Sequence, residues 1–153
     1  MTTREVTNKI MANAKAYTKR YLDAMPSEDY NFKPDPEVRS FAQQMLHLAD
    51  ANYYFISIAC GKPSPIGAVS LEQTIAPTKE ATVKAVLDSY DYCIDTLNEV
   101  TEDQLLETVK FGDLEVPRSA AFSKAYEHQA HHRGQAVLYM RLKGITPPDG
   151  IIF

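Results

Sequence analysis

Residues 118–143 read RSAAFSKAYEHQAHHRGQAVLYMRLK, an uninterrupted stretch without proline. Pro117 lies immediately before it and Gly144 immediately after it, with Pro147 and Pro148 beyond. Proline is favoured at the mouth of a helix because its fixed φ suits the first turn, and glycine is favoured just past the end. The stretch therefore predicts one long helix over residues 118–143.

Three upstream segments have the same helical character. Apolar residues recur in them at spacings of three or four positions, which gives each segment one apolar stripe. Prolines and glycines separate the segments from one another. We expect these helices over residues 4–25, over residues 38–60 and from Thr78 to about Leu97.

Two smaller elements are expected before the last helix. Thr101 and Gln104 form a capping-box pattern that predicts a short helix reaching Leu106. Residues 108–116 carry Gly-Asp between two apolar runs, which favours a small hairpin. The predicted fold class is all-α, an up-down-type four-helix bundle with long connections and a short β-hairpin before the last helix, forming a single domain over residues 1–153.

Composition limits the classes of partner. The chain has 153 residues, and its 16 Lys and Arg against 20 Asp and Glu give a net charge of -4. Since nucleic-acid affinity comes mainly from cations that neutralise phosphates, we expect no nucleic-acid partner. No apolar run approaches the ~20 residues that cross a bilayer, and the N-terminus lacks a secretory apolar region. The two cysteines, Cys60 and Cys93, imply no disulfide framework, so we expect a cytoplasmic protein without a membrane partner.

Three of the four histidines lie together in the last predicted helix. His128 and His132 are four residues apart, so they differ by about 40° around the helix axis and point the same way. This spacing allows one helix to offer two imidazoles to a single metal ion. The residues that share their face are mostly small or apolar, which directs the pair into the bundle: Ala121, Ala125, Gln135, Ala136 and Tyr139.

The third ligand must come from another helix, and His47 in the second predicted helix is the remaining histidine. A pairing of His128 with His131 at i, i+3 stays open, although it would leave His132 as an unused buried imidazole. We favour His47, His128 and His132 as the metal ligands and expect His131 at the rim. A zincin is excluded because Gln129 follows His128, and a ferritin-like site is excluded because no Glu-x-x-His occurs.

The segments around these histidines, Ser40–Ala49 and His128–Gln135, resemble those of the DinB/YfiT-like superfamily of metal-binding four-helix bundles, and the tail Leu142–Pro148 is also similar. The resemblance extends over essentially the whole chain. It implies a three-histidine site for zinc or nickel with open positions for water or substrate. It also implies a homodimer and, in some branches, transfer reactions that use a low-molecular-weight thiol.

An ion held by three neutral imidazoles lowers the pKa of a bound water to near ~7 and deprotonates a thiol. The favoured interpretation is therefore a metal-dependent enzyme, a thiol S-transferase or hydrolase acting on a small electrophilic substrate; the alternative is a non-catalytic metal-stabilised bundle or a small-ligand-binding protein. Gln44, Tyr54 and Gln135 lie on the ligand faces and are candidates for orienting the substrate or the histidines. Asp50 is a weaker candidate for a fourth ligand. Arg133 is expected to turn away from the site and pair with an acidic residue.

Overall fold

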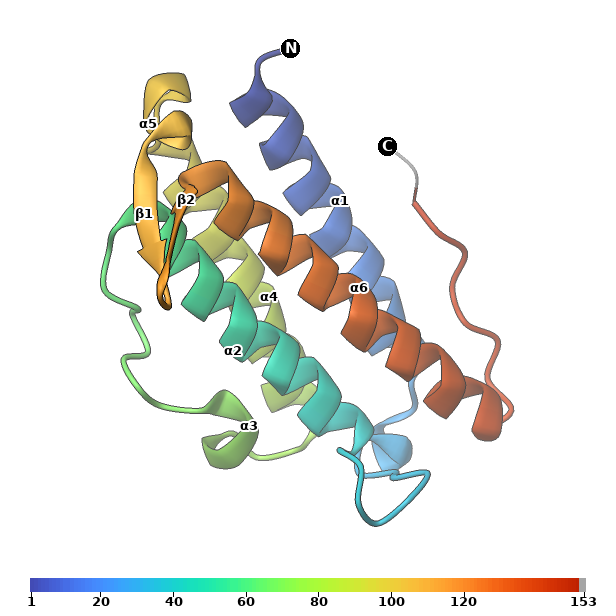
Figure 1. Cartoon of the computed structure of the whole chain (residues 1–153). Coiled ribbons are helices and arrows are strands. Elements are labelled where there is room, and N and C mark those ends of the chain that lie inside the picture. Colours follow the sequence, from blue (N-terminus) through green and yellow to red (C-terminus); the bar gives the residue numbers. More distant parts are fainter. Residues whose placement is uncertain (152–153) are drawn as a thin grey trace.

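The computed structural model describes residues 1–151 of the chain. Within that range four long helices form a bundle, and shorter elements connect them (Figure 1). In chain order the elements are α1 (Thr3–Ala24), the 3₁₀ turn η1 (Ser27–Asp29), α2 (Phe41–Cys60), α3 (Leu71–Thr74), α4 (Lys79–Asn98), α5 (Glu102–Leu106), β1 (Thr108–Phe111), β2 (Leu114–Pro117) and α6 (Arg118–Leu142).

Side-chain caps fix where the helices begin. Thr2, Ser40 and Thr101 each accept a hydrogen bond from a backbone N–H three residues on, and each forms a complete capping box. The second helix therefore begins at Phe41, three residues later than its apolar pattern predicts, because Ser40 is its N-cap. Gly61 ends the same helix with a φ of 62°, a left-handed conformation that favours glycine.

The four long helices are not arranged in strict alternation. Asn52 hydrogen-bonds Ser89, and Ser57 hydrogen-bonds Tyr92, so residue numbers rise together along α2 and α4 and the two helices are parallel. The connection over residues 61–78 carries the chain back along the bundle to make this possible (Figure 1). α2 runs antiparallel to α6, which packs on its other side. The predicted all-α bundle with long connections is confirmed.

The predicted hairpin is also confirmed. β1 and β2 pair antiparallel, with Val109 opposite Val116 and Phe111 opposite Leu114. Gly112 makes the turn with a φ of 61°. The long connection differs from the expected loop because it contains the single helical turn α3, which packs against α2.

A buried polar network crosses the middle of the apolar core. Gln129, which is fully buried, donates to Asn52 Oδ1 at 2.6 Å, and Asn52 Nδ2 donates to Ser89 Oγ at 3.0 Å. These bonds tie α6 to α2 and α2 to α4 at one level and satisfy the Asn52 side chain, whereas Gln129 Oε1 is buried without a partner among the described residues. Among the described residues, no helix is both long and apolar enough to cross a membrane.

Candidate metal centre

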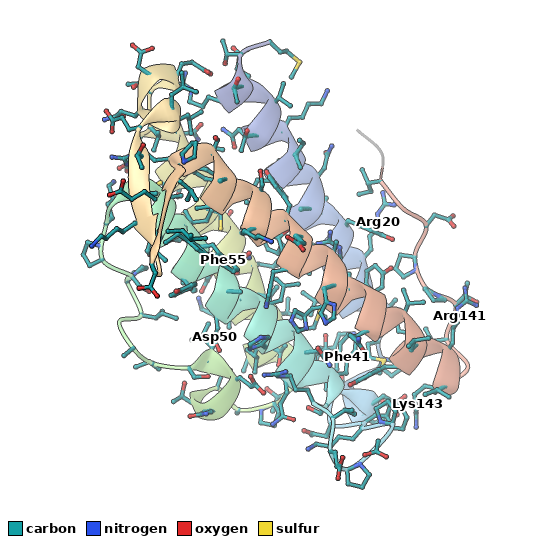
Figure 2. All side chains as sticks on the ribbon, viewed as in Figure 1. Arg20, Phe41, Asp50, Phe55, Arg141 and Lys143 are labelled. Carbon is teal, nitrogen blue, oxygen red and sulfur yellow. The ribbon has the colours of Figure 1, made fainter. Side chains whose placement is uncertain are left out.

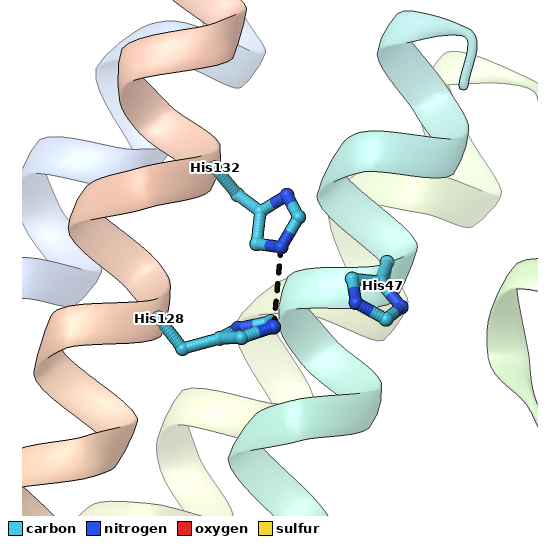
Figure 3. Close-up of side chains that lie close together, drawn as sticks. All are labelled: His47, His128 and His132. Atoms are coloured by element: carbon cyan, nitrogen blue, oxygen red, sulfur yellow. Dashed lines mark hydrogen bonds between the residues drawn. The ribbon is translucent and has the colours of Figure 1, made fainter. Parts of the chain in front are cut away.

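The three histidines singled out in the sequence converge between α2 and α6. His128 and His132 project from α6 and His47 projects toward them from α2 (Figure 3). The ring centroids of His47 lie 5.1 Å from those of His128 and 4.8 Å from those of His132, and each ring offers one nitrogen within 4.8 Å of the others. Facing mid-helix positions on two antiparallel neighbours bring these distant parts of the sequence together.

A chain of hydrogen bonds fixes the orientation of His132. Tyr139 Oη donates to the carbonyl oxygen of Arg39 at 2.7 Å, so its oxygen accepts from Gln44 Nε2 at 3.1 Å. Gln44 then directs Oε1 at His132 Nδ1, 2.6 Å away, and only a protonated Nδ1 can donate to it. The lone pair of His132 is therefore on Nε2, which faces His128 Nε2 at 3.1 Å (Figure 3).

A carboxylate performs the same role for His47. His47 Nδ1 lies 3.2 Å from Glu72 Oε2, and the second oxygen of Glu72 accepts from Arg39 Nε at 2.8 Å. The nitrogen of His47 that is turned away from Glu72 faces the other two rings (Figure 3). Metal-ligating histidines commonly donate the second ring N–H to a carboxylate or an amide, which holds the ring in one tautomer.

Asp50 explains why Glu72 is in place. Its carboxylate accepts from Ser70 Oγ at 3.0 Å and from the backbone N–H groups of Leu71 at 2.7 Å and Glu72 at 3.3 Å. In Figure 2 Asp50 lies on the side of α2 that faces α3. Asp50 also lies within reach of His47 in a second group of possible ligands. Its oxygens are nevertheless engaged in anchoring α3, so its role as a fourth ligand is not favoured.

Aromatic side chains cover His128. Phe55 packs edge-on against the imidazole at a centroid distance of 5.8 Å, and Phe111 of the hairpin stacks on Phe55 at 5.6 Å (Figure 2 labels Phe55). The Nδ1 atom of His128 is buried and has no hydrogen-bond partner among the described residues. The hairpin therefore encloses one side of the cluster with an apolar wall.

Burial favours the neutral form of all three imidazoles. It lowers the pKa of His128 to about 4 and that of His132 to about 3, with further lowering from the neighbouring histidines. The pKa of His47 is lowered as well, mainly by burial and then by the Arg39 guanidinium, against the opposing effect of Glu72. Neutral imidazoles have free lone pairs, which is the state that a metal ion requires.

Two cavities open beside the cluster. One of about 550 Å³ is lined by His131, His132, Gln135, Gln44 and Arg39 among others, and its walls are largely polar. The other, of about 340 Å³, lies beside His47 and is lined by the connection before α3. Small molecules can therefore approach the imidazoles from both sides.

The remaining candidates fall at different distances from the rings. Gln44 bonds His132 directly, Gln135 lines the larger cavity, and His131 is exposed at its rim, with its ring centroid 4.9 Å from that of His132. Tyr54 is 55% exposed and lines the smaller cavity, where its ring packs on Phe55. It borders the space beside His47 without a hydrogen bond to any of the three histidines.

The predicted ion pair of Arg133 is wrong. Arg133 turns away from the histidines as expected, but it points between α1 and α4 and donates to Thr18 Oγ1 at 3.2 Å and Tyr90 Oη at 3.3 Å. No carboxylate among residues 1–151 lies within ion-pair distance of it. The spacing of residues in the last helix shows that Arg133 turns away from His132, but it does not show which side chains of α1 and α4 Arg133 meets.

The sequence does not identify Glu72 as a site residue, because residues 61–78 show no pattern that would bring it close to His47. Its only local sign is Ser70 followed by Leu71 and Glu72, the start of one helical turn. Helical spacing places Tyr139 on the face of His128, but nothing in the sequence indicates that it links Gln44 to a backbone carbonyl.

The fold and this cluster define a helical-bundle protein whose imidazoles can hold a divalent metal ion. The family model of the DinB superfamily matches residues 11–136, and the chain belongs to that superfamily. A comparison with curated proteins finds no significant match.

Solved structures share the fold. A DinB-like protein from Bacillus cereus ATCC 10987 is similar with a TM-score of 0.82 and 19% identity, covering 96% of this chain and 97% of that one. The DinB-like protein YjoA of Bacillus subtilis gives a TM-score of 0.74 and 17% identity, covering 96% and 95%. A conserved protein of Enterococcus faecalis gives 0.66 and 19%, covering 93% and 97%. At these identities the likeness establishes the fold.

Proposed function

We propose that the protein binds one divalent metal ion, zinc or nickel, through His47, His128 and His132. The observation that carries the proposal is the convergence of three neutral imidazoles, two of which are oriented by a second partner, Gln44 for His132 and Glu72 for His47. Imidazole nitrogen suits both metals. Three protein ligands also leave a coordination position for a water or a substrate.

We further propose that the site is catalytic and promotes attack of a small thiol or water on a small electrophilic substrate. A divalent ion in this site would supply Lewis acidity and would lower the pKa of a thiol or water. The chain itself supplies orientation: Gln44 and Glu72 hold the imidazoles, and Phe55 excludes water from the side of His128. The cavities beside His132 and His47 offer space for two reactants.

The second candidate is a non-catalytic bundle in which the ion only joins α2 to α6. It is favoured by the lack of a free carboxylate beside the rings among residues 1–151. Glu72 is engaged by Arg39 and His47, and Asp50 by the start of α3. Neither carboxylate is free to act as a general base.

Metal analysis tests the first proposal. Protein purified without a histidine tag should contain about one equivalent of zinc or nickel, and the metal-free protein should rebind it in calorimetric titration. His47→Ala, His128→Ala and His132→Ala should each abolish tight binding, whereas His131→Ala, one residue away, should not. Equal binding by all four variants would overturn the assignment of the ligands.

An activity assay distinguishes the catalytic proposal from the non-catalytic one. The loaded protein is mixed with a model electrophile such as 1-chloro-2,4-dinitrobenzene and a panel of low-molecular-weight thiols, and conjugate formation is followed by absorbance. Catalysis should require metal and should disappear in His132→Ala. If metal raises the melting temperature but the loaded protein accelerates neither conjugation with any thiol nor hydrolysis of an ester, the catalytic proposal is overturned and the non-catalytic bundle is supported.

We also propose that the protein is a homodimer. Leu138 and Leu142 lie one turn apart on the outer face of α6 and are 57% and 64% exposed. They place two apolar side chains next to each other on this face, and a second copy of the chain would remove them from water. Sedimentation velocity should give twice the chain mass, and Leu138→Glu should give a monomer; a monomeric wild-type protein would contradict the proposal.

A further inference from the structure

A separate cavity of about 300 Å³ lies between α1 and α6, on a different face of α6 from the histidine cluster. The two helices run side by side in Figure 1, and the segment after α6 returns along them. Residues from both helices and from that segment line the cavity: Ile10, Asn13, Ala14, Tyr17, Tyr126, Ala130, Arg133 and Ile151.

Arg133 brings a positive charge to this cavity. Its Nη1 donates to Thr18 and Tyr90, and its guanidinium carbon lies 5.4 Å from the centroid of the Tyr17 ring. Among residues 1–151, no group accepts from its other two nitrogens and no carboxylate pairs with it. Arg133 is half-buried and its other two nitrogens are not among the buried unpaired atoms, so they are accessible to an anion that enters the cavity.

A second polar side chain beside the same cavity has a donor without a partner. Asn13 Nδ2 is buried and makes no hydrogen bond to any described residue. Most buried amide groups in proteins are satisfied, so an exception calls for an explanation. Asn13 on α1 borders the cavity opposite Arg133 on α6, but its unpaired Nδ2 is enclosed by protein and does not face the cavity.

The rest of the lining is apolar or already hydrogen-bonded. Ile10, Ala14 and Ile151 contribute apolar surface, and the Tyr126 hydroxyl donates to the carbonyl oxygen of Thr7 at 2.6 Å. We propose that this cavity binds a small monocarboxylate with an apolar or aromatic body, its carboxylate held by Arg133.

Charge and size both favour this class of ligand. Among the described residues that line the cavity, Arg133 is the one cation and none is acidic. A single negative charge is therefore balanced, whereas a phosphate dianion would leave one charge uncompensated. A volume near 300 Å³ is at the small end of ligand sites. Guanidinium and carboxylate also match in planar geometry.

The test uses benzoate as the probe and benzamide as its neutral counterpart of the same shape. Binding to the full-length, metal-free protein is measured by calorimetry and by saturation-transfer NMR. Benzoate should bind and raise the melting temperature, and benzamide should bind about tenfold or more weakly, because it lacks the charge. Equal binding of the two, or no benzoate binding at millimolar concentration, overturns the proposal.

Two variants place the bound probe. Arg133→Met should weaken benzoate binding about tenfold or more, while the exposed Arg141→Met should not. Because Arg133→Met also removes contacts within the bundle, Ile10→Phe provides an independent variant that fills the cavity and keeps the cation. It should abolish benzoate binding, whereas Val6→Phe, one turn away on α1, should leave it intact.

Benzoate binding that persists in Ile10→Phe, with the fold intact by circular dichroism, would show that the probe binds elsewhere and would overturn the assignment. Zinc titration of the same variants keeps this test independent of the histidine site. Ile10→Phe should bind zinc as the wild type does.

Discussion

Replacing Asp50 by alanine should weaken metal binding although Asp50 is not a proposed ligand. Its carboxylate accepts three hydrogen bonds from the start of α3, two of them from backbone N–H groups. α3 has four residues and cannot persist as an isolated helix. Without Asp50 this turn should therefore detach from α2 and carry Glu72 away from His47.

The expected size of the effect follows from these contacts. Three hydrogen bonds to a partly buried carboxylate contribute about 1 kcal/mol each, so the docking of α3 should lose about 3 kcal/mol. Loss of the partner that orients a metal-ligating histidine typically costs about 10–100-fold in affinity. We expect zinc to bind Asp50→Ala at least tenfold more weakly, with little change in far-ultraviolet circular dichroism.

A double-mutant cycle provides the assay. Zinc affinity is measured by competition with a chelator for wild type, Asp50→Ala, Glu72→Ala and the double variant, with the hairpin variant Asp113→Ala as a matched surface control. If Asp50 acts through Glu72, the double variant should bind about as weakly as Glu72→Ala alone. The reasoning would be refuted if the loss of zinc affinity in the double variant equalled the product of the two single-variant losses, or if Asp50→Ala bound zinc as tightly as the wild type.

Three further outcomes are expected. Because the pKa values of His132 and His128 are lowered to about 3 and about 4, the unfolded chain takes up protons first as pH falls. Urea unfolding of the metal-free protein should therefore show stability falling from pH 6.5 towards 4, by about 1 kcal/mol per pH unit from the buried His132 alone; a flat profile would contradict this. Tyr139→Phe leaves the Gln44 amide without its acceptor and should cost about 1–2 kcal/mol in urea unfolding, with weaker zinc binding; unchanged values for both would argue against the hydrogen-bond chain. Gly61→Ala places a side chain at a φ of 62° and should cost about 1 kcal/mol in the same measurement, and a stabilised variant would contradict it.

The local parts of the fold were predictable because local chemistry determines them. Caps at Thr101 and Gly61 and the Gly-Asp turn at 112–113 act through neighbouring residues, and the structure has each element where these signals predict it. Helical periodicity likewise predicts that His128 and His132 share one face. Periodicity predicts the start of α2 three residues too early because it carries no information about the cap at Ser40.

The parts that escaped prediction depend on long-range contacts. Glu72 reaches His47 only because α3 docks on Asp50, and neither its position nor its partner has a periodic signal. The environment of Arg133 depends on which side chains of α1 and α4 lie opposite it. Such contacts are set by the packing of whole helices, which a single sequence does not specify residue by residue.

The crossover that makes α2 and α4 parallel has an evolutionary consequence. The imidazoles belong to the rigid bundle, whereas the carboxylate beside His47 belongs to the segment over residues 61–78. Insertions or substitutions in surface connections are tolerated more readily than changes in a packed core. Sequence changes in that connecting segment can therefore alter the surroundings of His47, while the packing of the four helices and the positions of the other two imidazoles stay the same.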